Sequence, residues 1–465
     1  MGKQHPNIIV LMADTVQSQA LSCYGSPNVR TPHIDALAGQ ACLFERLYQP
    51  ANMCKPSRTS WMTGCYPSTH QVYDNTSFND RKQTTLLKLL SQAGYRGGYL
   101  GLFHCWHDRD RDGMDAWSWI DWAPDYGIED PSNPTPPTRQ DFLRHLAAMG
   151  VYPTGDHLKD FHDHAGYTDF PIEHHLCTRI TDKAIACIDD FRSDQANFLW
   201  YSSWMPHEPW APPAPYHTRY RPADMILPGN LRDPLTSRPA HQRVNHGRCA
   251  QVFSPDATGD GQLSRILAAY AGMVSFVDDN VGRIIAHLKR RGLYDDSIVV
   301  FTTDHGTAHG AHGWLYKGGP YMIDEISRIP LLIKFPGQSQ PQRIPDVLSS
   351  TDLFPTLLEH VGVAHAPVDG RSLSDVIAGK RRNNARAFGE HLDGTDHEAK
   401  SVRMLRKGRW KYNLYSQAGV DELYDLDADP LELHNIAADA GSIRRELRDE
   451  LVDYIRSRRD TFVVR

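Results

Sequence analysis

Two short apolar segments, each ending in a carboxylate, constrain the fold of this chain more than any other feature. Residues 7–14 read Asn-Ile-Ile-Val-Leu-Met-Ala-Asp, and residues 298–305 read Ile-Val-Val-Phe-Thr-Thr-Asp-His. Runs this apolar are typical of central strands buried on both faces of a parallel sheet. A single Asp after a single strand would more often belong to a turn or a helix cap. Because ligands of open α/β sheets bind outside the carboxyl ends of the strands, two such endings predict a metal site at Asp14 and Asp304.

The order of the remaining segments predicts an α/β fold. Residues 1 to about 105 alternate between strand and helix patterns, and the alternation returns after residue 177. This is typical of a large, mostly parallel sheet sandwiched by helices. The predicted strands are 7–14, 97–101, 197–204, 298–305 and 329–335, and the predicted helices are 31–41, one at the Cys54 segment, 84–93, 177–192, 262–291 and 352–362.

The sequence pattern changes after residue 372 and predicts two domains. Residues 1–372 are predicted to form the α/β domain, and residues 373–465 a smaller antiparallel α+β subdomain. The latter is predicted from short strands at 402–405, 410–415 and 422–426 and a charged helix from about 442. Residues 106–176 are rich in Asp, Pro, His and Trp and lack clear periodicity. Because structureless loops of this length are uncommon and usually functional, we interpret this stretch as an ordered insertion over the site.

Composition narrows the class of protein. With 465 residues, of which 40% are hydrophobic, the chain can bury a large core. A formal net charge of −6 gives no basic surface, and there is no 18-residue apolar run, so we expect neither nucleic acid nor membrane as a partner. We recognise no signal peptide, and the eight Cys lack regular spacing, as is typical of reduced thiols. We therefore expect a cytoplasmic protein, although a secreted chain that had lost its signal would look the same.

The motif with the most chemical content is Cys54-Lys55-Pro56-Ser57-Arg58, followed by Thr63-Gly64. In a chain of this composition Cys-x-Pro alone is expected about 0.5 times by chance, and an Arg two residues later lowers that to about 0.06. The segment resembles the C-x-P-S-R…T-G signature of type I, formylglycine-dependent sulfatases of the alkaline phosphatase superfamily. The alternative is an ordinary small, buried Cys before a helix.

The resemblance implies both a fold and a maturation step. The fold would be alkaline-phosphatase-like, and a formylglycine-generating enzyme would oxidise Cys54 to formylglycine, whose hydrated aldehyde attacks sulfur. The residues themselves allow this arrangement. If Pro56 starts a helix, Cys54 and Arg58 at i and i+4 lie on the same side of it. The nucleophile then lies at a helix N-terminus, where free N–H groups favour negative charge.

The resemblance also implies a set of metal ligands, namely Asp14, Asp304, His305 and the formylglycine at position 54. Many sulfatases carry a second carboxylate at position 15 and an Asn at position 305, whereas this chain has Thr15 and His305. We include Thr15 as a candidate ligand. Oxygen ligands with one imidazole suit one divalent ion, Ca²⁺ or Mn²⁺, with Mg²⁺ as a further candidate.

Three further residues match catalytic positions of the family. Lys317 resembles the lysine that binds the anion, and His207 resembles the histidine that protonates the leaving oxygen. His104 resembles the base that breaks down the sulfated hemiacetal, which releases sulfate and restores the aldehyde. The family usually has a lysine two residues before that base, and here Leu102 stands in its place. Because this cation is missing from the anion pocket, the sequence also favours the related phosphonate monoester and phosphodiester hydrolases as the class of enzyme. His309 and His312 flank the site and are candidate substrate contacts.

Three functional hypotheses follow. The first is a sulfuric ester hydrolase that cleaves a sulfate monoester of a carbohydrate or aryl alcohol. The second is a phosphonate monoester or phosphodiester hydrolase with the same nucleophile. The third is a catalytically silent metal-binding or sugar-binding protein in which Cys54 stays a thiol. The set of Lys317, His207 and the metal ligands argues against the third, because a binding module does not need them all. The sequence does not predict the substrate alcohol or the oligomeric state.

Overall fold

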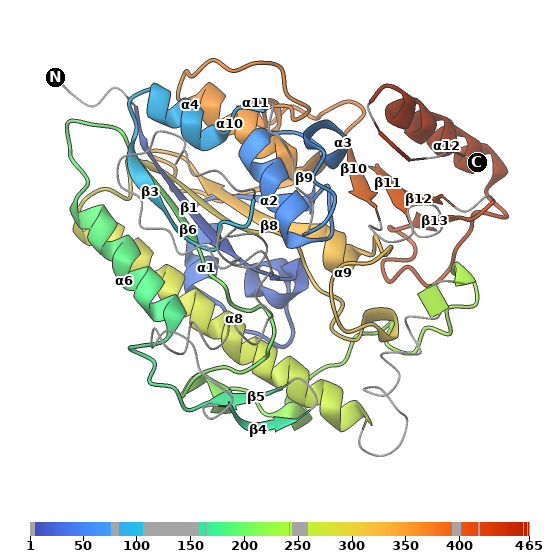
Figure 1. The fold of residues 1–465 in the computed structure, drawn as a ribbon, viewed down its shortest axis with the longest axis horizontal. Helices are drawn as coiled ribbons and strands as arrows, with labels where there is room; N and C mark the ends of the chain where they lie inside the picture. The colour runs from blue at the N-terminus through green and yellow to red at the C-terminus, as the bar shows by residue number, and fades with distance from the viewer. Residues whose placement is uncertain are drawn as a thin grey trace, which may run out of the picture.

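The structure is a computed structural model of the chain. It describes residues 5–75, 83–105, 158–162, 165–240, 242–243, 259–392, 401–416, 419–458, 460–462 and 464. Figure 1 shows a large sheet with helices on both sides and a smaller sheet beside it.

The large sheet has seven strands in the order β3-β6-β1-β7-β8-β2-β9. Every neighbouring pair is parallel except the two pairs that β8 makes with β7 and β2. The mostly parallel sheet predicted from the sequence is therefore confirmed. Its strands are β1 (Asn7–Ala13), β2 (Cys42–Tyr48), β3 (Arg96–Gly101), β6 (Asn197–Ser202), β7 (Ser297–Thr303), β8 (Arg328–Lys334) and β9 (Gln342–Ser349).

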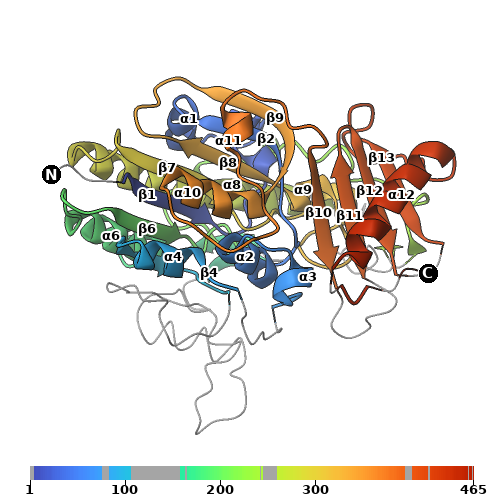
Figure 2. The ribbon, with the colours of Figure 1, turned by 90° about the horizontal axis from the view of Figure 1, so that it is seen from above.

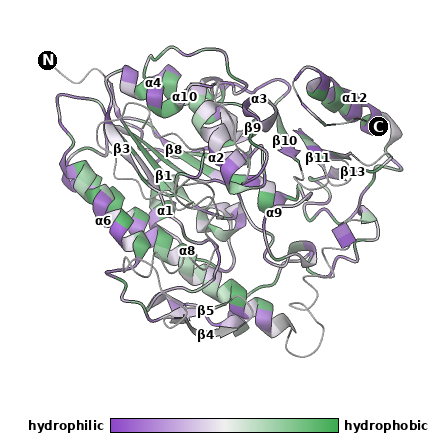
Figure 3. Cartoon of the chain, in the orientation of Figure 1, coloured by the Kyte–Doolittle hydropathy of each residue, from purple (hydrophilic) through white to green (hydrophobic). Residues whose placement is uncertain are grey.

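Helices cover both faces of this sheet because its central strands are apolar on both sides. Along β1, Ile9 and Leu11 pack against α1, α6 and α8, whereas Ile8 and Val10 belong to the cluster with α2, α4 and α10. Helices α6 and α8 carry hydrophobic and hydrophilic residues side by side, as expected for helices with one face on a sheet (Figure 3). The helices are α1 (Pro32–Ala38), α2 (Cys54–Thr63), α3 (Pro67–His70), α4 (Leu86–Gln92), α6 (Leu176–Asp189), α8 (Gly259–Arg290), α9 (Asp324–Ser327), α10 (Leu353–His360) and α11 (Ser374–Ile377).

The smaller sheet is antiparallel and lies at the C-terminal end (Figure 2). It consists of β10 (Arg386–His391), β11 (Val402–Lys407), β12 (Trp410–Tyr415) and β13 (Asp421–Asp425), and α12 (Gly441–Arg456) packs on it through Leu447 and Leu451. Buried polar contacts join it to the large domain: Lys411 Nζ lies 3.1 Å from Asp324 Oδ1, and Arg406 Nε lies 2.9 Å from the hydroxyl of Tyr48. The predicted α+β architecture is confirmed, and the boundary at residue 372 stays a prediction.

A two-stranded sheet of β4 (Leu158–His162) and β5 (Ala165–Thr168) belongs to the predicted insertion. Residues 106–157, the larger part of that insertion, lie outside the described residues, so its predicted place over the site is not tested. Among the helices that the structure describes, none combines the length and the apolar character needed to cross a membrane.

Candidate active site

Four neighbouring parallel strands direct their carboxyl ends to one edge of the large sheet. In β1 and β7, Ala13 is paired with Thr303, so the next residues, Asp14 and Asp304, lie side by side. His207 follows β6 and His104 follows β3, and these strands continue the same parallel set. Residues far apart in the chain thus meet where ligands of open α/β sheets bind.

Helix α2 delivers Cys54 to this edge. The helix begins at Cys54, two residues earlier than a start at Pro56 would give, so Cys54 occupies the first helical position. Pro56 falls within the first turn, where its missing N–H costs no helical hydrogen bond. All ten residues of α2 are buried, and only 3% of Cys54 is exposed. Burial, together with the nearby Asp14 carboxylate, raises the pKa of the Cys54 thiol well above its usual range.

The ligand atoms of Asp14, Cys54, Asp304 and His305 all lie within 4.8 Å of one another, and all four residues are buried. The structure therefore brings together the four ligands expected from the sequence. The His305 ring has the orientation that a metal ligand needs. Its Nδ1 lies 2.8 Å from the carbonyl oxygen of Gly306, to which it donates. In the neutral ring the lone pair is then on Nε2, which lies 3.0 Å from Cys54 Sγ.

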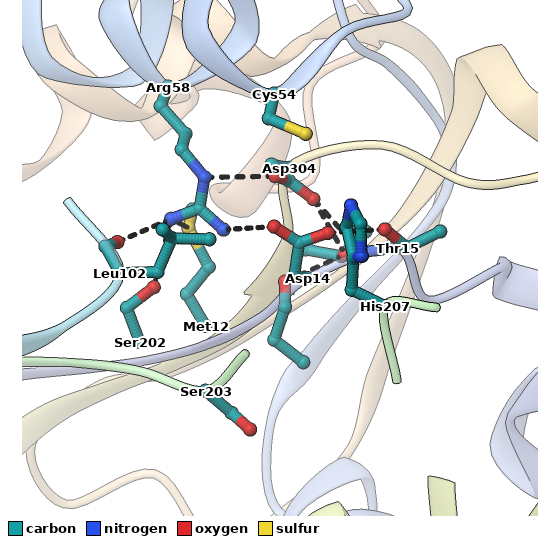
Figure 4. A network of polar contacts seen from close by, with 12 residues as sticks. Met12, Asp14, Thr15, Cys54, Arg58, Leu102, Ser202, Ser203, His207 and Asp304 are labelled. Carbon is teal, nitrogen blue, oxygen red and sulfur yellow. Dashed lines mark hydrogen bonds and ion pairs between the residues drawn. The ribbon is translucent and has the colours of Figure 1, made fainter. Parts of the chain in front are cut away.

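Arg58 holds the two carboxylates in place (Figure 4). Its Nε donates to Asp304 Oδ2 at 2.9 Å, and its Nη2 donates to Asp14 Oδ2 at 3.1 Å. Nη1 donates to the carbonyl of Leu102 at 2.7 Å and to Ser202 Oγ at 2.9 Å. One guanidinium thus faces two buried carboxylates, which leaves negative charge for a divalent cation to balance. Burial alone would raise the pKa of Asp14, but the electrostatic effects of His207, Arg58 and other neighbouring groups bring it to about 2.

Thr15 supports the carboxylates. Its hydroxyl donates to Asp14 Oδ1, and its backbone N–H donates to Asp304 Oδ1 at 3.0 Å. The φ angle of Thr15 is 67°, which is uncommon for a β-branched residue and indicates that the surrounding contacts impose this backbone shape. The hydroxyl of Tyr270 donates to the Thr15 carbonyl at 3.0 Å. The role of Thr15 as a metal ligand stays a prediction.

Lys317 and His207 meet beside the carboxylates, and Glu208 joins them. Lys317 Nζ lies 2.5 Å from His207 Nε2 and donates to the two oxygens of the Glu208 carboxylate at 2.9 and 3.1 Å. Glu208 was not predicted as a site residue from the sequence. Its only signal was its place directly after His207, and the contact with Lys317 depends on how two distant loops pack.

His104 and Leu102 show how the chain departs from the expected lysine pattern. The side chain of Leu102 is 1% exposed and belongs to a hydrophobic cluster with Leu100 and Ile180. His104 is buried, and its pKa is held well below its usual range by burial and by the positive charges of Arg58 and Lys55. Lys55, which is also buried, therefore places a cation near His104 that was not predicted from the sequence.

The two flanking histidines differ in their surroundings. His309 packs between Trp210 and Tyr270 with ring centroids 4.9 and 4.1 Å away, and neither of its ring nitrogens has a hydrogen-bond partner among the described residues. Its contact with substrate stays a prediction. His312 is buried and both of its ring nitrogens have protein partners, and its contact with substrate also stays a prediction. Nδ1 lies 2.7 Å from Asp233 Oδ2, and Nε2 lies 3.0 Å from Asn230 Nδ2 and 3.1 Å from Arg238 Nη2.

Comparison with protein families agrees with this geometry. The sequence model described as Sulfatase matches residues 6–363, and the one described as N-sulphoglucosamine sulphohydrolase, C-terminal, matches residues 310–458. The chain belongs to the sulfatase family, whose named members are hydrolases acting on sulfate esters.

Individual relatives and solved structures are similar to this chain over nearly its whole length. The chain is 26% identical over 507 residues to N-acetylglucosamine-6-O-sulfatase of Bacteroides thetaiotaomicron, covering 95% of this chain and 84% of that protein. A structure solved in complex with its substrate D-glucosamine-2-N,6-O-disulfate is 23% identical with a TM-score of 0.76, covering 97% and 98% of the two chains. A phosphonate monoester hydrolase from Silicibacter pomeroyi is 24% identical with a TM-score of 0.80, covering 99% and 96%. At these identities the two structures show the fold alone.

Proposed function

We propose that this protein hydrolyses a sulfate monoester of a saccharide or small alcohol, with formylglycine made from Cys54 as the nucleophile. The observation that carries the proposal is the convergence of Asp14, Asp304 and His305 on Cys54 at the start of α2. The saccharide is favoured because a named relative and one neighbouring structure act on sulfated glucosamine. The partner for maturation would be a formylglycine-generating enzyme. The seven described cysteines are all free, which supports the cytoplasm as the proposed location.

The proposed mechanism assigns each residue one task. When formed and bound, formylglycine supplies a hydroxyl as nucleophile and the divalent ion polarises the sulfuryl oxygens. Arg58 fixes the two carboxylates, and Lys317 faces the negative charge that grows on the equatorial oxygens. His207 gives a proton to the leaving oxygen as its bond to sulfur breaks. His104, held neutral by its surroundings, accepts the proton that must leave the nucleophile before sulfate departs.

The donor set fits one hard divalent ion, because two carboxylates and one imidazole lone pair converge on a buried point that keeps excess negative charge. We expect metal-depleted protein to gain about 2.7 kcal/mol of unfolding free energy when the ion is present at one hundred times its Kd. The imidazole of His305 favours Mn²⁺ over Ca²⁺, so Mn²⁺ should raise the melting temperature more at equal concentration. Asp304→Asn should abolish the gain. A melting temperature that no divalent ion changes would contradict the site.

A second candidate is the phosphonate monoester or phosphodiester hydrolase. It is favoured by the apolar Leu102 in place of a lysine and by the fold shared with the phosphonate monoester hydrolase. We expect kcat/KM to be larger for 4-nitrophenyl sulfate than for 4-nitrophenyl phenylphosphonate, measured on the same preparation. The reverse order would assign the chain to the second class.

The same preparation must be characterised at residue 54. Mass spectrometry of the peptide that contains Cys54 should show a form about 18 Da lighter than the cysteine form, as conversion to formylglycine requires. Activity should rise with the fraction of that form when the chain is co-expressed with a formylglycine-generating enzyme. A peptide that stays in the cysteine form after co-expression, with no activity on either ester, would favour the silent binding protein.

A further inference from the structure

The loops that follow β6 and β7 are fastened to each other at two points. The Glu208 carboxylate accepts two hydrogen bonds from Lys317, and two residues further on Trp210 stacks on Tyr316, with centroids 5.6 Å apart and an interplanar angle of 16°. Strands β6 and β7 lie on either side of β1. The contacts therefore connect the two loops across the strand that ends at Asp14, and they fix Lys317 relative to His207.

The hydrogen bonds of His207 define its protonation in this arrangement. Nδ1 lies 2.7 Å from the backbone carbonyl of Glu208, and a carbonyl only accepts, so Nδ1 carries a hydrogen. Nε2 lies 2.5 Å from the Lys317 ammonium, which only donates, so Nε2 accepts and the ring is neutral. The Glu208 carboxylate lies 3.4 Å from Nδ1. In this state the three side chains carry one positive and one negative charge.

In the neutral ring Nε2 carries no proton that could go to a leaving group. To act as the acid, His207 must therefore take up a second proton at Nε2, beside the positively charged Lys317. We propose that Glu208 is a positioning residue that makes this possible, because its carboxylate holds Lys317 and balances the second positive charge. This inference rests on the proposed ester hydrolysis. His207 Nε2 takes a proton from water, delivers it to the leaving oxygen as the sulfur–oxygen bond breaks, and returns to the neutral ring.

The electrostatics of the described residues agree with this role. Burial lowers the pKa of His207, the Glu208 carboxylate raises it, and Lys317 lowers it. Asp14, at the end of β1, also raises it, and His207 in turn helps to lower the pKa of His104, after β3. Glu208 is the carboxylate in contact with both His207 and Lys317.

The test compares leaving groups. Glu208→Gln should lower kcat about 10- to 100-fold for 4-methoxyphenyl sulfate, whose phenolate needs a proton, and less than about threefold for 4-nitrophenyl sulfate, whose phenolate does not. Glu208→Asp keeps the charge and should recover most of the loss. The matched control is Glu45→Gln, because Glu45 is half-buried and pairs with Arg343 far from the site, and it should change neither rate. Equal losses on both esters, or no loss, would overturn the proposal.

A second measurement does not depend on activity. In the metal-loaded protein labelled with ¹⁵N-histidine, the His207 titration midpoint should fall by about one pH unit in Glu208→Gln and stay unchanged in Glu45→Gln. If the unaltered protein hydrolyses neither sulfate nor phosphonate esters, the proposed function is wrong, and this midpoint still tests Glu208. An unchanged midpoint in a folded Glu208→Gln protein overturns the role of Glu208 whatever the substrate is.

Discussion

Arg58→Gln is expected to lower the free energy of unfolding by about 3–5 kcal/mol, because it leaves two buried carboxylates without their shared cation. Arg58 is 1% exposed, and Asp14 and Asp304 are fully buried, so water cannot replace the lost partner. The same change removes the N–H groups of Arg58 that orient both carboxylates, so the rate of hydrolysis should fall below detection. Urea unfolding with and without Mn²⁺ measures the first effect.

The matched control is Arg221→Gln, which breaks an exposed pair with Asp224 and should leave the unfolding midpoint unchanged. Added Mn²⁺ should recover part of the stability of Arg58→Gln, since the ion balances the same carboxylates. If Arg58→Gln unfolds at the midpoint of the unaltered protein, the two carboxylates do not depend on this guanidinium, and the description of the site is wrong.

Cys54→Ala is expected to lower kcat on the order of 10⁴-fold or more, because no other group in the site can take the place of the nucleophile. The fold should be retained, since a buried Cys replaced by Ala leaves only a small cavity that costs about 1 kcal/mol. Steady-state hydrolysis of the preferred ester and thermal unfolding check the two statements separately.

Cys65→Ala is the matched control, because Cys65 is as buried as Cys54 and lies just beyond the other end of the same helix. It should retain full activity. Comparable activity of Cys54→Ala and the unaltered protein would place the chemistry elsewhere and remove the proposed mechanism.

The fold was predictable where the sequence pattern follows directly from burial. The uninterrupted apolar runs of β1 and β7 are buried along their whole length, and both were recognised. Strand β2 was missed because Glu45 and Arg46 interrupt its apolar pattern, and a register shift occurs there in its pairing with both neighbours. Strand β9 was missed because it contains Pro345, which is tolerated because β9 is an edge strand.

The site was predictable to the extent that its residues follow recognisable strands or belong to the Cys54 motif. Asp14, Asp304 and His305 meet these conditions. Glu208 does not, because its importance comes from Lys317, which lies more than one hundred residues away in the chain. His312 is the reverse case, in which a local pattern predicted a site residue but could not predict its partners. Its spacing after Asp304 resembles that of a site residue, yet the contacts with Asp233 and Arg238 depend on tertiary packing that no local pattern reveals.

The buried link of Lys411 to Asp324 bears on how the molecule can be divided. Lys411 Nζ also lies 2.6 Å from Glu432 Oε1, so one ammonium from the small sheet neutralises acids contributed by both parts of the chain. This link therefore crosses the predicted boundary at residue 372 and connects the two parts of the chain. Removing residues 373–465 would take Lys411 away from Asp324 and leave this carboxylate with Arg328, 3.7 Å away, as its ion-pair partner among the described residues. We therefore expect residues 1–372 alone to be less stable than the whole chain.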